Sequence, residues 1–244
     1  MKKKIIPVIV ALVLIVIVAV VGFGKKIWDK YSYGKEAADL DEYYGVGEGE
    51  LAIVLQDDFI SNRAVVKNDA VYFDYDTITE YLNEGFYVDK GEEKLLYTTA
   101  NDTKTALFGE KSYSDRDGTH SLEYEVCYLQ GDVFYVAADY VKLVTNYAYT
   151  RFDRHLQVYT QWGEKQTMEV VKDTQIRLKG GIKSPILREL EEGEIVEILE
   201  EMETWSKVKT SDSMIGYVEN KRLANLSSET ETPVADYAAE EYTS

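Results

Sequence analysis

Cys127 and His155 are the two residues of this chain that could together form a nucleophile and its base. A thiol beside an imidazole is the arrangement that activates a cysteine for attack. Cys127, however, stands in the run 123–129, whose pattern is that of a strand. A small buried side chain is expected at such a position. The pattern therefore favours a structural cysteine over a catalytic one.

Several aspartates lie close together in the sequence. The run 115–118 resembles part of a calcium-binding loop, but the further ligands and the closing glutamate are not in register, so a turn is expected. The pairs at 57–58 and 74–76 do not by themselves give the two carboxyls of unequal pKa that glycosidases hold across a cleft. Asp74 or Asp76, and Asp139, are placed to cap short helices.

The remaining chemistry-bearing residues are few. His120, His155 and the single cysteine are not clustered as copper or zinc ligands are. The glycine-rich run 45–49 has neither the spacing of a dinucleotide fingerprint nor the Lys-Ser/Thr pair of a phosphate loop. We therefore expect no catalytic residue, no metal and no cofactor, and we do not expect an enzyme.

The charge of the chain also narrows its partners. The net charge is −17, although the first 35 residues carry seven lysines and one aspartate, so the remainder is more acidic still. A phosphate backbone would be repelled by such a surface, and nucleic acid is excluded as a partner. A single cysteine excludes an internal disulfide.

Residues 5–23 contain no charge, hydroxyl or amide and consist almost entirely of Ile, Leu, Val and Phe. Their length suits a hydrocarbon core of about 30 Å, so we expect an uncleaved transmembrane anchor. Residues 1–4, with three lysines, are expected to stay in the cytoplasm, which places the bulk of the chain outside a cell membrane crossed once. The alternative is a cleaved signal peptide, but Gly22-Phe23-Gly24 is a poor cleavage site.

Two segments flank the expected domains. Residues 24–49 are expected to form a stalk whose first aromatic residues suit a membrane interface. Residues 225–244 are rich in acidic residues, contain no basic one and have hardly any large aliphatic residue. Such a composition cannot bury enough apolar surface to fold alone, so a disordered linker or tail is expected there.

Residues 50–161 contain an internal repeat at an offset of 62 positions. The run 71–73 falls on 133–135, and the run 96–98 falls on 158–160, without a gap. Each copy has a turn between two β-rich runs, then apolar residues at helical spacing, then two more β-rich runs. The sequence therefore predicts a ββαββ unit that is used twice.

This pattern resembles the domain named after the N-terminal domain of copper amine oxidase. The runs 132–136, 140–144 and 156–160 carry the resemblance best, while residues 145–147 depart from the Leu-Gly that usually follows the helix. In bacterial envelope proteins this domain is non-catalytic, and the copper of the namesake enzyme is bound elsewhere. The resemblance thus implies neither an activity nor a metal.

Residues 170–224 predict a small closed barrel of five short strands. Side chains alternate along 195–199, and further strands are expected at 205–209 and 216–219. The segment resembles a bacterial SH3 domain. Its first loop, 177–181, reads Arg-Leu-Lys-Gly-Gly in place of the family's usual Arg-Ser-Gly-Pro run.

Bacterial SH3 domains of this type commonly bind peptidoglycan or its stem peptides, and the resemblance implies this general role. Trp205 and Tyr217 are the candidate ligand-binding residues, because an aromatic face can stack on a sugar or a peptide. The alternative is that both side chains pack into the core of the barrel.

The expected fold class is α+β and all-β, with one N-terminal transmembrane helix, a duplicated ββαββ domain and a small SH3-like β-barrel. The expected function is that of a non-catalytic extracytoplasmic module, anchored in the membrane, that binds peptidoglycan, another cell-wall glycan or a protein. The alternative is the targeting half of a wall-active or chitinase-like hydrolase. Glycoside hydrolase family 18 proteins often begin with this order of domains, although the catalytic signature of that family is absent from the chain.

Overall fold

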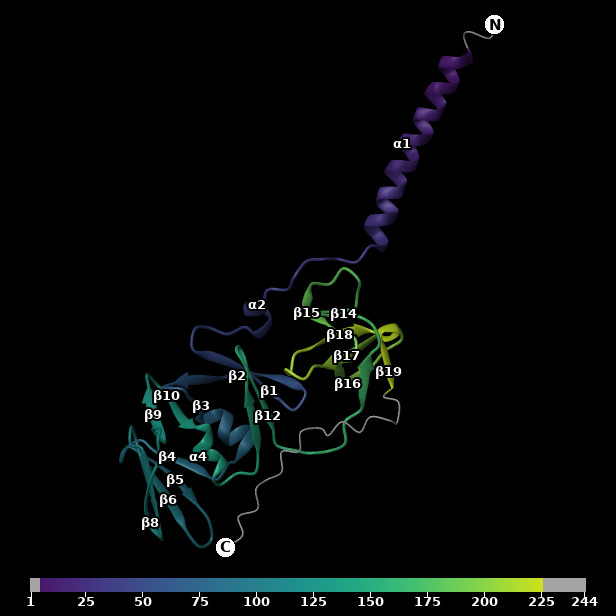
Figure 1. Ribbon diagram of the computed structural model, residues 1–244. Coiled ribbons are helices and arrows are strands. Elements are labelled where there is room, and N and C mark those ends of the chain that lie inside the picture. The colour runs from purple at the N-terminus through teal and green to yellow at the C-terminus, as the bar shows by residue number, and fades with distance from the viewer. Residues whose placement is uncertain (1–4, 226–244) are drawn as a thin grey trace.

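The computed structural model describes the backbone of residues 5–225, and the side chains of that range except 5–12 and 19–21. Helix α1 (Ile5–Tyr31) projects away from two bodies made mostly of strands (Figure 1). Among the described residues, no helix is found that is both long and apolar enough to cross a membrane. Residues 1–4, and all but the first of 225–244, lie outside the described part of the chain.

The first body contains both copies of the repeat, and each copy has the element order ββαββ. Its elements are β1 (Glu50–Leu55), β2 (Asp58–Lys67), β3 (Ala70–Asp74), α3 (Tyr75–Thr77), the π-helical turn η2 (Ile78–Leu82), β4 (Phe86–Asp89), β5 (Lys94–Thr98), β6 (Thr103–Leu107), β7 (Ser112–Asp115), β8 (Gly118–Ser121), β9 (Cys127–Gln130), β10 (Val133–Ala137), α4 (Ala138–Lys142), β11 (Ala148–Arg151) and β12 (His155–Tyr159).

The two copies send their last hairpins to different sheets. The first hairpins, β2–β3 and β9–β10, lie side by side because β3 pairs antiparallel with β10. The hairpin β11–β12 joins the same sheet, where β12 pairs parallel with β1, giving the order β11-β12-β1-β2-β3-β10-β9. The hairpin β4–β5 instead begins a second sheet, β4-β5-β6-β7-β8, at the far end of the molecule (Figure 1).

One apolar core holds both sheets and the short helices together. Phe73 from the large sheet, Leu95 from the small sheet, and Ile78 and Tyr140 from the helical segments all have a relative exposure of 0%. Burying one such side chain stabilises the fold by about 2 kcal/mol. Asp74 caps α3 as expected, because its carboxylate accepts the Thr77 backbone N–H at 2.6 Å. Asp139 lies in the first turn of α4 and does not cap it, since the cap position is Ala137.

The second body is a seven-stranded sheet in the order β15-β14-β18-β17-β16-β13-β19. Its elements are β13 (Thr167–Val170), β14 (Thr174–Arg177), β15 (Ile186–Leu190), β16 (Ile195–Glu201), β17 (Trp205–Lys209), β18 (Ile215–Glu219), the 3₁₀ turn η3 (Asn220–Arg222) and β19 (Leu223–Asn225). The five predicted strands correspond to β14–β18, and β13 and β19 extend the sheet beyond them.

The second sheet differs from the predicted closed barrel. Among the described residues no strand pairing joins β15 to β19, so the ladder remains open there. A close approach elsewhere keeps the sheet compact: a Cβ at Gly216 on β18 would lie 2.7 Å from the Arg177 carbonyl oxygen and 2.7 Å from Ile176. Only glycine allows β14 and β18 to approach this closely.

Residues 24–49, predicted as a stalk, are largely attached to the second body. Helix α1 continues to Tyr31, and the chain then pairs with the free edge of β15 through a parallel bridge between Ala37 and Ile186. The backbone N–H of Gly34 donates to the Ile182 carbonyl oxygen at 2.7 Å. A backbone ladder requires no particular side chains, which is why the sequence pattern did not reveal it.

The short helix α2 (Leu40–Tyr44) follows this edge segment and contacts both bodies. Asp39 caps its N-terminus, and Gly45 closes it in the left-handed conformation with φ 59°. The Tyr43 hydroxyl donates to the Ile215 carbonyl oxygen at 2.6 Å, and Tyr44 is 5% exposed. The segment therefore joins the helix end, the SH3-like sheet and the repeat domain.

Candidate functional site

Trp205 and Tyr217 lie on the same face of two paired strands. In the β17–β18 register Trp205 is opposite Glu219 and Lys207 is opposite Tyr217, and opposite residues share a face of a sheet. The alternate positions, Val208 and Val218, are fully buried in the core of the body. Trp205, Lys207 and Tyr217 are therefore on the outer face.

Both candidate aromatic residues are partly exposed, and neither belongs to the buried core of the second body. Their role as ligand-binding residues stays a prediction. Gly180, in the loop between β14 and β15, lies against both: a Cβ there would approach Trp205 to 3.3 Å and Tyr217 to 3.6 Å. The outer face therefore presents two aromatic side chains that both contact the backbone of Gly180.

Arg177 ends β14 just before this loop and keeps the first residue of the family's usual Arg-Ser-Gly-Pro run. Arg177 is 1% exposed, and its guanidinium donates to the Ser184 carbonyl oxygen at 2.6 Å and to the Gly34 carbonyl oxygen at 3.0 Å. Burial lowers the pKa of Arg177, with Glu189 and Tyr33 opposing that shift. Arg177 therefore fastens both the β14–β15 loop and the segment that follows α1.

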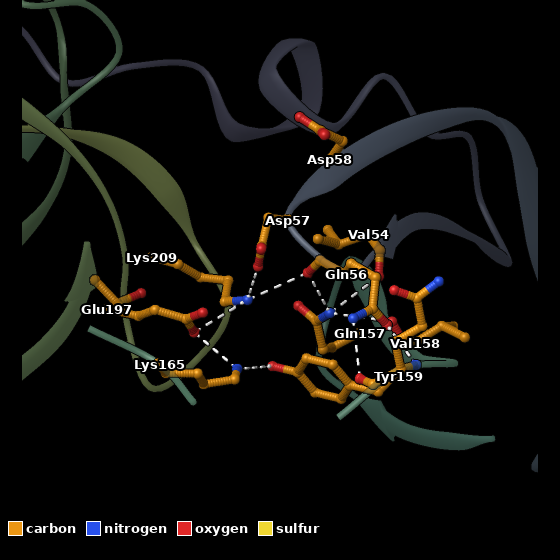
Figure 2. Close-up of polar contacts among 12 residues, drawn as sticks. Val54, Gln56, Asp57, Asp58, Gln157, Val158, Tyr159, Lys165, Glu197 and Lys209 are labelled. Atoms are coloured by element: carbon orange, nitrogen blue, oxygen red, sulfur yellow. Dashed lines mark hydrogen bonds and ion pairs between the residues drawn. The ribbon is translucent and has the colours of Figure 1, made fainter. Parts of the chain in front are cut away.

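The two bodies meet at a cluster of charged residues that sequence reasoning missed. Figure 2 shows the Lys209 ammonium between Asp57, from the turn after β1, and Glu197, from β16. Lys209 is 2% exposed, contacts the Asp57 carboxylate, and lies 3.2 Å from the Glu197 carboxylate. Lys165 approaches the same Glu197 oxygen at 2.8 Å. These residues are over 100 positions apart from Asp57, so no local pattern connects them.

Hydrogen bonds also connect the residues on the repeat-domain side of this charged cluster. Figure 2 places Gln157 beneath the turn that carries Gln56. The Gln157 side-chain amide donates to the carbonyl oxygens of Gln56 at 2.8 Å and Val54 at 3.2 Å, and Lys209 donates to the Gln56 carbonyl oxygen at 3.2 Å. A buried ion cluster of this kind fixes geometry more than it adds stability. Its role here is to set how the two bodies face each other.

The other candidate residues have structural roles in the described part of the chain. Cys127 is 0% exposed, and burial raises the pKa of its thiol to about 12. His155 lies on β12, five strands away from Cys127 on β9, which is roughly 24 Å at about 4.8 Å per strand. A thiol–imidazole pair is therefore excluded.

The aspartate run 115–118 forms the expected turn between β7 and β8. Hydrogen bonds from Lys104 at 2.7 Å and from His120 at 2.9 Å hold the pKa of the Asp115 carboxyl well below its usual range. Within the residues the structure describes, no group of three or more His, Cys, Asp or Glu side chains could hold a metal ion.

Comparison with known proteins identifies one region. Residues 172–224 match the family model described as bacterial SH3 domain. The match covers β14 to the start of β19, so the second body contains a domain of the bacterial SH3 type. No curated protein matches the chain.

One solved structure, described as NlpC1 from Trichomonas vaginalis, is 13% identical with a TM-score of 0.23. The match covers 57% of this chain and 40% of that chain, so the present sequence spans less than half of that structure. At this TM-score the likeness extends to neither the fold nor the function of the chain. The comparisons do not show the resemblances to the copper amine oxidase domain and to glycoside hydrolase family 18, and both stay predictions.

Proposed function

We propose that this protein is a non-catalytic module of a cell envelope, anchored in the membrane, that binds peptidoglycan through the outer face of its SH3-like domain. The observation that carries the proposal is the placement of Trp205 and Tyr217 on one partly exposed face, against Gly180, within the region that matches the bacterial SH3 family.

The chemistry of the outer face suits a polymer made of sugars and short peptides. Half-exposed aromatic rings stack on the apolar faces of sugar rings or on peptide planes. Lys207 is opposite Tyr217 in the register and two residues along β17 from Trp205, and its side chain is 28% exposed. Its ammonium group can bind a carboxylate of the polymer. The carboxylate of Asp58 is 3.7 Å away from this ammonium group.

The anchoring part of the proposal rests on the sequence of residues 5–23 and on the lysines before them. It places the N-terminus in the cytoplasm and both bodies outside the cell membrane. Protease added to intact protoplasts should then digest epitope tags inserted at the β7–β8 turn and leave a tag at the N-terminus intact. Protection of the β7–β8 tag would contradict this orientation.

The binding proposal is tested with the full-length protein in detergent, sedimented with insoluble peptidoglycan. Each aromatic contact is expected to contribute about 1 kcal/mol, so the double variant Trp205→Ala/Tyr217→Ala should bind at least about tenfold more weakly. Trp162→Ala is the matched control, because Trp162 is 57% exposed and lies in the connection between the bodies.

The result that supports the proposal is loss of sedimentation in the double variant and not in the Trp162→Ala control. Equal sedimentation of the double variant and the parent protein would show that another surface binds the wall. If the parent protein does not sediment, wall binding by this protein is wrong. Release of soluble fragments from the wall during the incubation would contradict the non-catalytic part of the proposal.

A further inference from the structure

A cavity of about 340 Å³ lies at the boundary between the repeat domain and the SH3-like domain, away from Trp205 and Tyr217. Four segments contribute to it: α2, the β11–β12 turn, β15, and the loop before β18. Its lining is Leu40, Tyr44, Phe152, Asp153, Arg154, His155, Leu187, Arg188, Asp212 and Met214. A volume near the lower end of the range of ligand sites, at a domain boundary, suits a small molecule and not a folded partner.

The floor of this boundary cavity is apolar. Leu187 and Met214 are 7% and 5% exposed and belong to the core of the SH3-like domain, and Leu40 packs against the same core. Such a floor accommodates one aliphatic side chain of a ligand. Burial of an aliphatic side chain there would contribute about 2 kcal/mol to binding.

One wall of the cavity is a stack of three rings. The His155 imidazole lies between Tyr44, with ring centroids 4.8 Å apart, and Phe152, with centroids 4.6 Å apart, and both pairs are nearly parallel. His155 is 4% exposed, and the one hydrogen bond of its imidazole to the described residues joins Nε2 to the Asp212 carbonyl oxygen at 2.9 Å. Since Nε2 donates to a carbonyl, Nδ1 of the neutral ring remains as an acceptor. Burial keeps the ring neutral by lowering the pKa of His155, and the hydrogen bond to Asp212 opposes that shift.

The rim of the cavity carries charges of both signs. Arg154 lies 2.6 Å from the Asp41 carboxylate and 3.2 Å from the Asp153 carboxylate. Arg188 lies 2.8 Å from the Glu194 carboxylate and 3.5 Å from the Asp212 carboxylate. The two arginine side chains remain 37% and 30% exposed. A guanidinium has five donors, so each arginine can bind a ligand carboxylate while keeping both of its acidic partners. The aspartates of the rim would repel a polyanion, and the arginines would repel a polycation.

We propose that the boundary cavity binds a short peptide with free ends, about two residues long, as a zwitterion. The peptide carboxylate binds Arg154 and Arg188, its amino end donates to His155 Nδ1 and the rim aspartates, and an aliphatic side chain lies on Leu187 and Met214. This site is separate from the outer face of the SH3-like domain and binds a free peptide instead of the wall polymer. Because its walls come from both bodies, the bound peptide also holds them together.

Isothermal titration of the full-length protein in detergent with the dipeptide alanyl-leucine tests the site. The expected result is saturable binding to one site. N-acetyl-alanyl-leucine amide, which has the same side chains and no charged ends, should bind at least about tenfold more weakly, because two charge-assisted hydrogen bonds are lost. Two single variants, Arg154→Gln and Arg188→Gln, should each lose a similar factor.

Arg116→Gln is the matched control, because Arg116 is exposed at the β7–β8 turn and does not line the cavity. The control must bind alanyl-leucine as the parent protein does. The proposal is overturned if the parent protein does not bind the dipeptide at about 10 mM, a concentration that would reveal even a weak site. It is equally overturned if the blocked peptide binds as well, or if both arginine variants, checked by circular dichroism for folding, bind unchanged. Sedimentation with peptidoglycan should be the same in all these variants, which separates this site from the proposed wall-binding face.

Discussion

The hairpins β4–β5 and β11–β12 are the same part of the repeat in two different surroundings. Tyr87 pairs with Leu96 in the first, and Tyr149 pairs with Val158 in the second, so the register is conserved at the offset of 62 positions. The first hairpin begins a sheet that packs on the core, whereas the second meets the SH3-like domain. The second hairpin also packs on the apolar core, through Leu156 and Val158, but it meets polar groups of the neighbouring domain as well.

Equivalent side chains show what this difference requires. Leu95 in β5 and Gln157 in β12 occupy the same repeat position and are 0% and 1% exposed. Tyr97 packs on Phe86 with ring centroids 5.0 Å apart, whereas the equivalent Tyr159 lies 4.5 Å from the Lys165 ammonium. The comparison teaches that the second hairpin is the one adapted to a neighbouring domain. Its His155 hydrogen-bonds to Asp212 across the boundary, and Gln157 hydrogen-bonds to the β1–β2 turn that carries Gln56.

Replacing Leu95 of the first hairpin by glutamine, the residue at the equivalent position of the second, should have the largest effect on stability. Leu95→Gln buries an amide among apolar neighbours without the carbonyl partners that Gln157 has, which is expected to lower the free energy of unfolding by about 3 kcal/mol. Urea denaturation measures this loss. Leu143→Gln, at a residue that is 52% exposed, is the control and should change little. A loss no larger than in this control would show that the two hairpin environments are interchangeable.

Removing the cation on the polar side should have the next largest effect. Lys209→Ala leaves the carboxylates of Asp57 and Glu197 facing each other, although Lys165 still compensates Glu197. We expect a loss of about 2 kcal/mol in the free energy of unfolding. Lys94→Ala is the counterpart in the first hairpin, where the partner Glu92 is exposed, and no measurable change is expected there. Equal denaturation midpoints for the two variants would contradict a special role of the boundary cluster.

The smallest expected effect is a dependence on pH that belongs to the second hairpin alone. Burial lowers the pKa of His155 below its ordinary value of 6.5, so the unfolded chain binds a proton more readily than the folded one. The resulting stability is fully present above pH 6.5 and is lost as the pH falls toward the pKa of the folded state. The charged groups facing the ring are Arg154 on its own turn and Asp212 from the SH3-like domain.

Melting temperatures at pH 7 and pH 5 measure this effect. His155→Phe keeps the ring stack and should reduce the fall in melting temperature between the two pH values. An identical fall in the His155→Phe variant and the parent protein would assign the pH dependence to other groups.

Local patterns were sufficient for much of the fold. The repeat at an offset of 62 positions agrees with the positions of both hairpin pairs, and alternation along 195–199 agrees with β16. Strands β6 to β8 were missed because they are short and rich in Thr and Ser, so they show no apolar alternation. The edge pairing of residues 34–38 was missed because backbone hydrogen bonds leave little trace in the choice of side chains.

The candidate sites show the same limit. Trp205 and Tyr217 could be chosen from their type and strand positions, but their place on the outer face depends on the register of β17 with β18. The boundary cavity and the Lys209 cluster join residues that are more than 50 positions apart, and no periodicity connects such residues. Charged residues on a strand are ordinarily taken as solvated, which is why Lys209 gave no signal.

The attachment of the chain just after α1 has a mechanical consequence. The helix ends at Tyr31, and the backbone N–H of Gly34 already donates to Ile182 in the β14–β15 loop. Only two residues lie between these points, and the three steps from Tyr31 to Gly34 span at most about 11 Å. A connection this short has almost no slack, so a pulling force on the SH3-like domain reaches the helix without first extending a linker. The SH3-like domain is therefore expected to rotate together with the helix, and the proposed binding face rotates with them.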